Sequence, residues 1–333
     1  MRKVKIAQIG TSKNSHGSDI WKSLCKQNDI FEVCGYVLPE NEREKCPSRV
    51  GVFDGYRELT VEEIMNDHEI EAVAIETEEI YLTKYAIMAA GHKKHIHMEK
   101  PGGTELPEFE RLIEEVRRNN CVFHTGYMYR YNPYVMELKE KIKRGELGDI
   151  ISVEAQMNCV HDDSVRNWLV NFPGGIFFFL GCHLVDLIYS IQGKPQEIIP
   201  LSCSTGVNGI NTYDYGMAAF KYERGISFAK TNDTQRGGVA KRHITVTGTK
   251  ATVDICPLEM DAPGNLQFAE KTEYTKENWC ERGVKSQSEL FDRYDAMMAG
   301  FASYVRGEKK NPWSYEYELE LYKLVLKACG IKF

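Results

Sequence analysis

The first third of the chain alternates apolar strands with amphipathic helices, and this alternation constrains the fold more than any other feature. Five apolar segments have the pattern of buried strands: residues 4–9, 31–37, 72–75, 95–98 and 121–126. Helical patterns separate them at residues 18–27, 61–66, 81–90 and 106–119, and Gly91 is expected to form a left-handed cap on the third helix. Strands that alternate with helices pair in parallel through right-handed crossovers. The sequence therefore predicts a doubly wound α/β domain over residues 1–126.

The regular alternation of strands and helices ends after Gly126. Helical patterns at residues 132–144 and 176–192 are mixed with consecutive strand patterns, and two helices, at residues 290–306 and 315–328, end the chain. The strand patterns cover residues 150–159, 197–203, 213–222, 225–233, 242–248 and 251–255. Consecutive strands with short glycine-containing connections form antiparallel sheets. Residues 127–333 are therefore expected to form an α+β domain with a large open, mostly antiparallel sheet.

Composition narrows the function classes. The 333 residues are 42% hydrophobic and 27% charged, as in ordinary globular proteins of two domains, and the formal net charge is -6. An acidic chain is a poor partner for nucleic acid. The sequence has no signal-peptide pattern and no apolar run of membrane-spanning length, and its ten cysteines form no C-x-x-C pair. We expect a cytoplasmic protein with reduced thiols and no membrane partner.

A strand, a glycine and then a helix form the usual site of a dinucleotide pyrophosphate, because backbone N–H groups and the helix dipole converge there. This loop has serine at positions 12 and 15, where the G-x-G-x-x-G pattern has glycine. Serine is small and can donate to phosphate. The expected contacts are Gly10, Thr11, Ser12, Asn14, Ser15 and His16. An acid at the end of the second strand would favour NAD over NADP, but Leu38 occupies this position. Glu40 is the nearest acid that could replace it. The sequence therefore does not decide between NAD and NADP.

Five landmarks occur in an order that resembles the Gfo/Idh/MocA oxidoreductase family. They are Ala72–Thr77, Ala86–Gly91, His97–Pro101, Gly126–Pro133 and Gly174–Asp186. The resemblance covers nearly the whole chain. It implies an N-terminal Rossmann domain and a C-terminal domain often used for oligomer contacts, here in a homo-oligomer (dimer or tetramer). It also implies hydride transfer between a hydroxyl of a sugar, polyol or inositol and NAD or NADP.

Two residues are the candidate catalytic pair. Lys100 ends a strand and precedes a proline; burial beside a cationic nicotinamide would disfavour its ammonium and make it a proton acceptor. The resemblance assigns it contacts with substrate and nicotinamide, and Glu99 and Thr77 contacts with the cofactor. His183 lies on a helix and, by the resemblance, is the acid/base toward the substrate hydroxyl. The alternatives are a surface lysine and a core histidine.

The chain departs from the family pattern four residues before His183, where Phe179 replaces the usual aspartate. The replacement removes a carboxylate that would orient the imidazole and stabilise its cation. Asp186, one turn later, is a partial substitute.

Further polar and aromatic residues are substrate-binding candidates, although a solvated loop explains each of them equally well. They are Tyr127, Arg130, Asn132, Arg166, Trp168 and Asp186. His161, Asp162, Asp163, Cys182 and His183 match no closed zinc spacing, so no metal is expected. The histidines at 92, 95 and 97 are expected to be structural.

Three functions remain open. The first is an NAD(P)-dependent dehydrogenase acting on a sugar or cyclitol. The second is a redox-neutral lyase or glycosidase that retains and recycles NAD, which the loss of the acid at Phe179 would favour. The third is a non-catalytic, dinucleotide-binding regulatory protein, favoured by the altered residues Ser12, Ser15 and Leu38.

Overall fold

The computed structural model describes residues 2–333, which form two compact units. The N-terminal unit comprises residues 2–127 together with Tyr294–Tyr322. The C-terminal unit comprises Met128–Arg293 and Lys323–Phe333. The sequence predicted a single boundary between residues 126 and 127. The contacts place this boundary after Tyr127, and they assign the later segment Tyr294–Tyr322 to the first unit.

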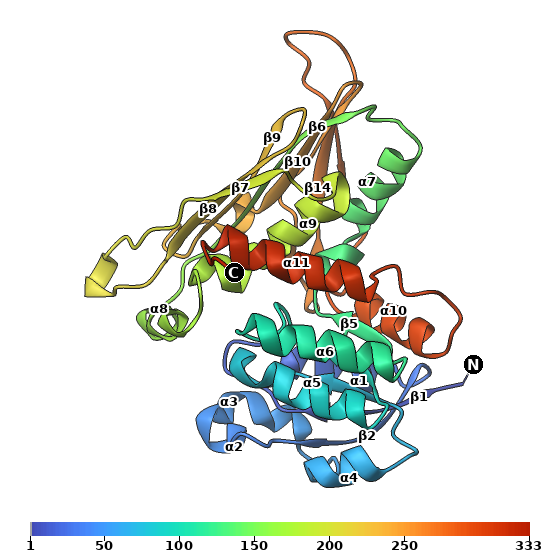
Figure 1. Cartoon of the computed structure of the whole chain (residues 1–333). Helices are drawn as coiled ribbons and strands as arrows, with labels where there is room; N and C mark the ends of the chain where they lie inside the picture. The colour runs from blue at the N-terminus through green and yellow to red at the C-terminus, as the bar shows by residue number, and fades with distance from the viewer. Residues whose placement is uncertain (1) are drawn as a thin grey trace. The chain divides into compact units, whose positions relative to one another are not determined.

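A five-stranded parallel sheet forms the centre of the N-terminal unit (Figure 1). Its strands are β1 (Val4–Ile9), β2 (Phe31–Val37), β3 (Ala72–Ile75), β4 (His95–Met98) and β5 (Phe123–Thr125). Their order is β2-β1-β3-β4-β5, so the direction of strand addition reverses beside β1. In such sheets ligands bind outside the carboxyl ends of the strands at the point of reversal. The predicted doubly wound fold is confirmed.

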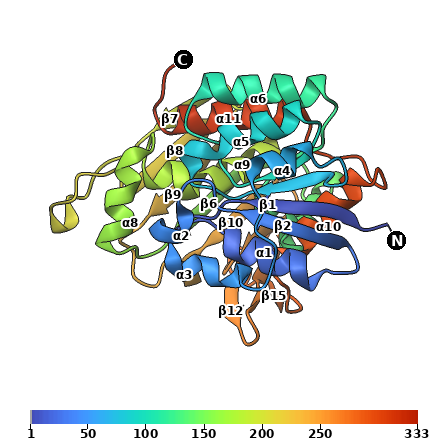
Figure 2. The same ribbon diagram turned by 90° about the horizontal axis from the view of Figure 1, so that it is seen from below.

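Helices cover both faces of this sheet (Figure 2). Helices α5 and α6 lie together on one face, and α1 and α10 pack against each other on the other. The helices of the unit are α1 (Gly17–Lys26), α2 (Glu42–Lys45), α3 (Pro47–Val50), α4 (Val61–Asn66), α5 (Leu82–Gly91), α6 (Leu106–Arg118) and α10 (Asp295–Val305), with the short turns η1 (Gly51–Phe53) and η2 (Glu79–Tyr81). Helix α11 (Tyr315–Ala328) is divided between the two units after Tyr322.

The predicted left-handed cap at Gly91 is wrong. Gly91 is the last residue of α5, His92 follows with φ -92°, and the left-handed residue is Lys93, with φ 60°. The left-handed residue therefore lies two positions later than expected, directly before the buried Lys94. Its ammonium donates hydrogen bonds to the carbonyl oxygens of Asp67 and Ile70 at 2.6 and 2.7 Å.

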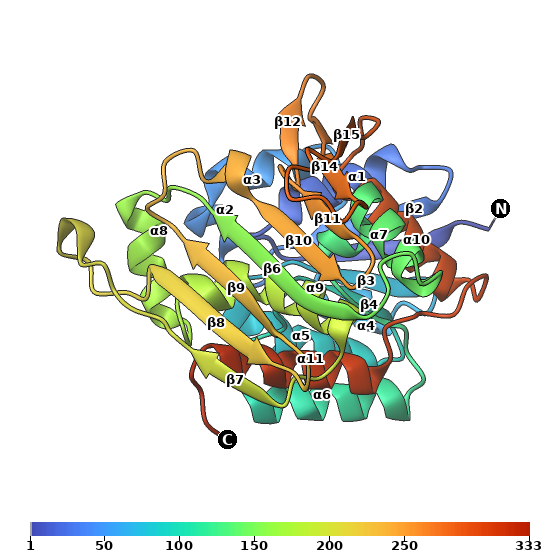
Figure 3. The same cartoon turned by 90° about the horizontal axis from the view of Figure 1, so that it is seen from above.

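The C-terminal unit contains an eight-stranded sheet of order β15-β14-β11-β10-β6-β9-β8-β7 (Figure 3). Every neighbouring pair is antiparallel except β6 and β9, which are parallel. The prediction of a mostly antiparallel sheet is confirmed. The strands are β6 (Ile150–Asn158), β7 (Glu197–Pro200), β8 (Tyr215–Lys221), β9 (Ile226–Asn232), β10 (His243–Gly248), β11 (Thr252–Ile255), β14 (Glu270–Tyr274) and β15 (Val284–Gln287), and a separate hairpin joins β12 (Met260–Ala262) to β13 (Leu266–Phe268).

One face of this large sheet is buried and carries α9, while residues on the other face stay partly exposed (Figure 3). The predicted helix at 176–192 begins with a π-helical turn, η5 (Phe177–Gly181), and continues as α9 (Cys182–Gln192). The remaining helices are α7 (Pro133–Lys143) and α8 (Asp163–Trp168), with the turns η3 (Met128–Tyr131), η4 (Leu169–Asn171), η6 (Val207–Gly209) and η7 (Val239–Lys241). No helix within residues 2–333 is both long and apolar enough to span a bilayer.

An aromatic cluster anchors α1 and η1 to β2. The ring of Phe53 stacks on Tyr36 at 4.5 Å between centroids and meets Trp21 edge-on at 4.9 Å. Phe53→Ala would lose this buried area and leave a cavity, at a cost of about 3–5 kcal/mol in the free energy of unfolding. Urea unfolding followed by near-ultraviolet circular dichroism measures it. Trp279→Ala, at a fully exposed ring, is the control and is expected to change stability by less than about 0.5 kcal/mol. Equal effects of the two substitutions would contradict this packing.

Candidate functional site

Gly10 begins the loop between β1 and α1 in a conformation that requires glycine. Its φ is +77°, and a Cβ atom there would clash with the methyl group of Thr77 and lie 2.8 Å from Glu42 Oε1. The loop backbone and the segment after β3 are therefore in van der Waals contact. This close approach is typical of the first glycine of a dinucleotide-binding loop.

The two serines that replace glycine in this loop bond to each other. Ser12 N–H donates to Ser15 Oγ and Ser15 N–H donates to Ser12 Oγ, both at 3.0 Å. Ser15 Oγ in turn donates to the carbonyl oxygen of Glu76 at 3.3 Å. The hydroxyl proton of Ser12 is not used in these bonds and can be donated to an oxyanion. The serines therefore keep the loop compact without removing its capacity to donate.

The other loop candidates lie near the same point. His16 precedes α1, and its Nδ1 is 2.6 Å from the hydroxyl of Tyr294. Asn14 is partly exposed. Thr11 and Thr77 are buried, and within residues 2–333 neither hydroxyl has a hydrogen-bond partner. Orphaned hydroxyls at the carboxyl ends of β1 and β3 fit a polar ligand in this crevice, so these residues suit a dinucleotide.

The acid nearest to Gly10 is Glu42, which the sequence did not indicate. Glu40, the expected substitute for an acid at the end of β2, accepts hydrogen bonds from Lys84 Nζ at 2.7 Å and from Tyr85 Oη at 2.5 Å. Glu42 is buried on α2, and its Oε2 accepts from the N–H of Glu40 at 2.7 Å. Burial raises the pKa of Glu42. Its other oxygen faces the Gly10 loop, where an adenosine ribose would lie.

Lys100 lies in a buried cluster of carboxyl groups. Its side chain is 1% exposed, and Nζ is 3.6 Å from Glu99 Oε1. Glu76 and Glu79 are also buried, and within residues 2–333 neither side chain has a hydrogen-bond partner. Because Ile75 and Met98 are paired on β3 and β4, Glu76 and Glu99 leave the sheet side by side. The sheet thus places an ammonium and three carboxyl groups at one end of the crevice.

One ammonium cannot neutralise three buried carboxylates, so the cluster retains protons. Burial raises the pKa of Glu79 to about 8, against the opposing charge of Lys100. Burial likewise raises the pKa of Glu99 to about 7, and burial together with the charge of Glu99 raises that of Glu76. From the sequence, only burial and the nicotinamide were expected to act on the charge of Lys100. The structure adds three acids that share its charge.

A pair of buried histidines continues this cluster across the sheet. His97 Nδ1 on β4 is 2.8 Å from His124 Nδ1 on β5, and His97 Nε2 is 3.5 Å from Glu76 Oε1. Burial lowers the pKa of His97 to about 3, so the ring is neutral and the two histidines have complementary tautomers. His97, expected to be structural, links β4 and β5 to the carboxyl groups near Lys100.

In the C-terminal unit, His183 is 1% exposed and lies in the first turn of α9. Its ring meets Tyr129 edge-on at 5.4 Å between centroids. Tyr129 Oη donates to Glu259 Oε1 at 2.6 Å, and Arg242 Nη1 donates to the same oxygen at 2.9 Å. The hydrogen bond to Glu259 fixes the position of the Tyr129 ring, against which the imidazole of His183 packs.

Phe179, which replaces the expected aspartate, belongs to an aromatic group. Trp168 meets its ring at 5.2 Å and 89°, and His161 lies 6.3 Å away. Asp186, the suggested substitute for the lost acid, instead forms a buried ion pair with Arg130, with nitrogen–oxygen distances of 2.9–3.1 Å. This pairing commits the carboxylate of Asp186 to the guanidinium of Arg130.

The other substrate-binding candidates have different environments. Asn132 caps α7 by accepting from the N–H groups of Tyr134 and Val135, and it donates to the carbonyl of Leu258. The remaining candidates differ in exposure: Arg166 and Tyr127 are buried, and Trp168 is partly exposed. Within residues 2–333, no three His, Cys, Asp or Glu side chains are arranged to hold a metal ion, and all ten cysteines are free.

The buried acids near Lys100 predict a specific pH dependence of stability. Since the pKa of Glu79 is raised from 4.5 to about 8 by folding, the folded chain binds this proton more tightly than the unfolded chain. The contribution of Glu79 is therefore complete below about pH 4.5 and is lost as the pH rises to about 8. Glu79→Gln is expected to flatten the decline of the urea midpoint between pH 5 and pH 8.5 in the protein without cofactor.

Glu62→Gln, at an exposed acid on α4, is the matched control and should retain the wild-type profile. If Glu79→Gln follows the wild-type profile as well, Glu79 does not retain its proton in the folded state.

Two family models match the chain. The model described as "Oxidoreductase family, NAD-binding Rossmann fold" matches residues 4–127, and the model described as "GFO/IDH/MocA C-terminal domain" matches residues 135–254. Myo-inositol 2-dehydrogenase of Thermotoga maritima is 25% identical over 47% of this chain and 46% of its own. Glucose-6-phosphate 3-dehydrogenase of Bacillus subtilis is 26% identical over 57% of this chain and 53% of its own. The chain thus spans about half the length of these curated relatives.

Solved structures share the fold over almost the whole chain. A 3-ketoreductase from Actinomadura kijaniata, in complex with NADP and TDP-benzene, superposes with a TM-score of 0.78 at 14% identity and covers 97% of this chain and 96% of its own. UDP-N-acetylglucosamine 3-dehydrogenase from Acidithiobacillus ferrooxidans has a TM-score of 0.76 at 16% identity, with coverages of 99% and 98%. The matches to both domain models, over residues 4–127 and 135–254, show that the chain belongs to the Gfo/Idh/MocA oxidoreductase family.

Proposed function

We propose that the protein is an NAD(P)-dependent oxidoreductase that transfers a hydride between a hydroxyl of a sugar, polyol or inositol-type substrate and the nicotinamide. The observation that carries the proposal is the position of Lys100. Its buried ammonium lies at the carboxyl end of β4, in the same sheet edge as the Gly10 loop. A charge buried among titratable carboxyl groups at a ligand-binding edge supports proton transfer.

The cofactor contacts would come from the crevice of the N-terminal unit. The bound nicotinamide would exchange hydride with the substrate carbon. The N–H groups and hydroxyls of the loop would donate to the pyrophosphate, and Thr77 and Glu99 would contact the cofactor near Lys100. The residues concerned are Gly10, Thr11, Ser12, Asn14, Ser15, His16, Thr77, Glu99 and Lys100.

Lys100 and His183 would divide the proton chemistry. When an alcohol is oxidised, its hydroxyl proton must be accepted as the hydride leaves, and an imidazole suits this role near neutral pH. Lys100 would donate a hydrogen bond to the substrate oxygen, and Glu99, 3.6 Å from its ammonium, would exchange protons with it. Tyr129 would hold the ring of His183 in place.

The names of the relatives favour a carbohydrate substrate, since they include an inositol dehydrogenase and a sugar-phosphate dehydrogenase. Trp168, partly exposed, would offer a ring face, and Tyr127 a hydroxyl. Arg130, Asn132, Arg166 and Asp186 would act mainly by fixing the surrounding backbone, because each is already bonded within its unit.

We further propose a homo-oligomer, dimer or tetramer, in the cytoplasm. The partly exposed face of the large sheet carries Tyr215, Met217 and Phe228, an apolar group suited to a second copy of the chain. The ten free cysteines fit a reducing compartment.

A redox-neutral reaction with retained NAD is the second candidate. It is favoured by Phe179, whose ring packs against Trp168 where a carboxylate would otherwise orient His183. Product formation without net accumulation of NADH would establish it, and steady growth of NADH absorbance would exclude it. Failure to bind any dinucleotide at millimolar concentration would instead favour a non-catalytic regulatory protein.

Gly10→Ala tests the dinucleotide site directly. A methyl group there would clash with Thr77, so NAD(H) and NADP(H) affinity in calorimetric titration is expected to fall at least tenfold. Gly55→Ala is the control, because Gly55 also has a positive φ, +84°, but nothing lies within 4 Å of the added carbon. Equal affinities of the two variants would place the cofactor elsewhere.

Substitution of the proposed catalytic pair tests the reaction. With the dinucleotide that binds best, a panel of sugars and polyols identifies the substrate. Lys100→Met and His183→Asn are then expected to lower kcat/KM by about 10²–10⁴, the range for general acid–base groups. Lys3→Met, at an exposed lysine, is the control. Unchanged turnover in Lys100→Met would disprove the assigned role.

A further inference from the structure

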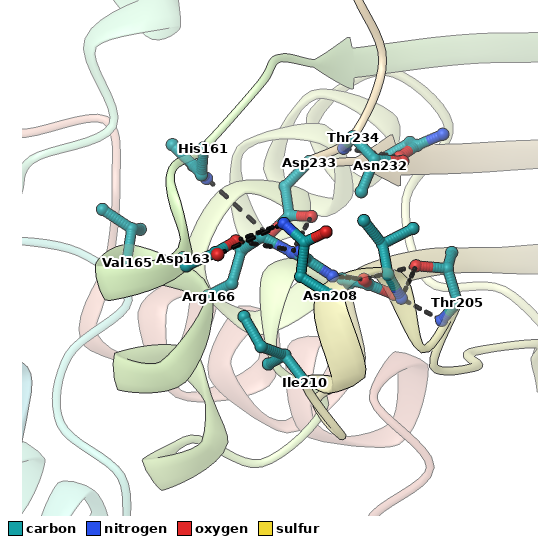
Figure 4. Close-up of polar contacts among 12 residues, drawn as sticks. His161, Asp163, Val165, Arg166, Thr205, Asn208, Ile210, Asn232, Asp233 and Thr234 are labelled. Carbon is teal, nitrogen blue, oxygen red and sulfur yellow. Dashed lines mark hydrogen bonds and ion pairs between the residues drawn. The ribbon is translucent and has the colours of Figure 1, made fainter.

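A polar cluster in the C-terminal unit is not used by the proposed reaction (Figure 4). Arg166 reaches from α8 to two buried carboxyl groups: its Nη2 is 2.5 Å from Asp214 Oδ2, and its Nε is 3.7 Å from Asp233 Oδ1. Asp214 also accepts hydrogen bonds from the N–H and hydroxyl of Thr205, at 2.7 and 2.6 Å. Two carboxylates therefore share one guanidinium out of contact with water.

Asp233 is the less well satisfied of the two. It follows β9 and has no exposed surface, and within residues 2–333 neither of its side-chain oxygens has a hydrogen-bond partner. Arg166 is bonded closely to Asp214, which leaves Asp233 in need of a second cation. His161 is in position to supply it, because its Nδ1 lies 3.8 Å from Asp233 Oδ2. A buried carboxylate without such a partner would be costly.

The surroundings of His161 favour its protonated form. Burial alone would lower its pKa, but Asp233 and the thiol of Cys159 outweigh burial and raise the pKa of His161 to about 9. The neighbouring acids have other partners. Asp162 accepts from the N–H groups at the start of α8, and Asp163 accepts from Asn208 and Arg166. His161 is therefore an imidazolium at neutral pH.

This cation lies beside the position at which the chain departs from its family. The side chain of His161 is 23% exposed, and its ring is 6.3 Å from that of Phe179, four residues before His183. Trp168 borders the other side of Phe179. Where a carboxylate is expected, this chain therefore presents a neutral ring and an adjacent positive charge. The neutral ring of Phe179 removes one negative charge from this neighbourhood, which lowers the electrostatic cost of placing a negative group beside His161.

We propose that His161, held by Asp233, binds an anionic substituent of the substrate, a carboxylate or a phosphate on the sugar or polyol. This inference rests on the proposed function and narrows its substrate class. A charge-assisted hydrogen bond from Nε2–H, which lies 3.5 Å from Cys159 Sγ, would hold the anion, while Asp233, itself 3.7 Å from Arg166, lies on the Nδ1 side of the ring. His161 would thus determine specificity, and His183 would retain the proton chemistry.

Matched pairs of compounds test the proposal: glucose against glucuronate, and glucose against glucose 6-phosphate. In the wild-type protein, kcat/KM is expected to be at least tenfold higher for one of the anionic members, and which one distinguishes a carboxylate site from a phosphate site. His161→Gln is expected to reduce that ratio at least tenfold. His161→Lys, which restores a cation, should recover much of it. The control His243→Gln, at a partly exposed histidine on β10, should leave the ratio unchanged.

Calorimetric titration of glucuronate and glucose 6-phosphate, with NAD(H) or NADP(H) present, gives a readout that does not depend on turnover. Binding that weakens above about pH 9 and in His161→Gln, with no turnover, would support the anion site and refute the proposed reaction. A wild-type preference for glucose, no binding of either anion, or an equal loss of neutral and anionic compounds in His161→Gln would overturn the inference. Circular dichroism confirms that each variant is folded.

Discussion

The ammonium of Lys100, buried among three carboxyl groups, is the interaction on which the proposed chemistry depends. A parallel sheet brings the ends of its strands to one edge, so Glu76 and Glu99 emerge together from β3 and β4. Their burial prevents all of them from being charged at once, and the shared protons remain within reach of the lysine. The arrangement is costly for folding, which is typical of groups retained for function.

Buried carboxyl groups also determine protonation in the C-terminal unit. Asp214 and Asp233 are buried, and their charges require Arg166 and His161 as counterions. In the N-terminal unit an excess of acid holds protons near one lysine, whereas here an excess of buried carboxylate holds a proton on one histidine. Burial and neighbouring charges therefore determine the protonation of Glu79 in the N-terminal unit and of His161 in the C-terminal unit.

Of two departures from the expected family motifs, one is compensated locally and the other is not. The serines at positions 12 and 15 satisfy each other's N–H groups and keep the loop closed. The ring of Phe179 fills its position by packing against Trp168, but no acid replaces the lost charge, since Asp186 is bound to Arg130. The first change leaves the hydroxyl proton of Ser12 able to donate to an oxyanion, and the second alters the charge that a substrate would meet.

The sequence was sufficient for the elements with strong local patterns. The apolar runs of β1 to β4 matched the boundaries seen in the structure, and the order of strand and helix patterns predicted the doubly wound unit and the mostly antiparallel sheet. β14 and β15 were not predicted, because segments such as Glu270–Tyr274 are largely charged and lie near the sheet edge. The π-helical turn before α9 has no apolar period that distinguishes it from an ordinary helix.

The sites show the same limit. Glu76 directly follows a predicted strand and could have been recognised as a residue of the crevice edge. The pairing of His161 with Asp233 depends on β6 and β9, which are parallel neighbours far apart in sequence within an otherwise antiparallel sheet. No local pattern encodes that register. Burial of Arg130 and Arg166 as ion pairs was likewise invisible to residue type alone.

A crystal structure of the protein with bound NAD(H) or NADP(H) would decide whether Lys100 and His183 serve one reaction. The Lys100 amine and the His183 imidazole are expected to face the C4 carbon of the nicotinamide together, on either side of a substrate hydroxyl. Two nitrogens that open into separate cavities, or a dinucleotide bound away from the Gly10 loop, would contradict it.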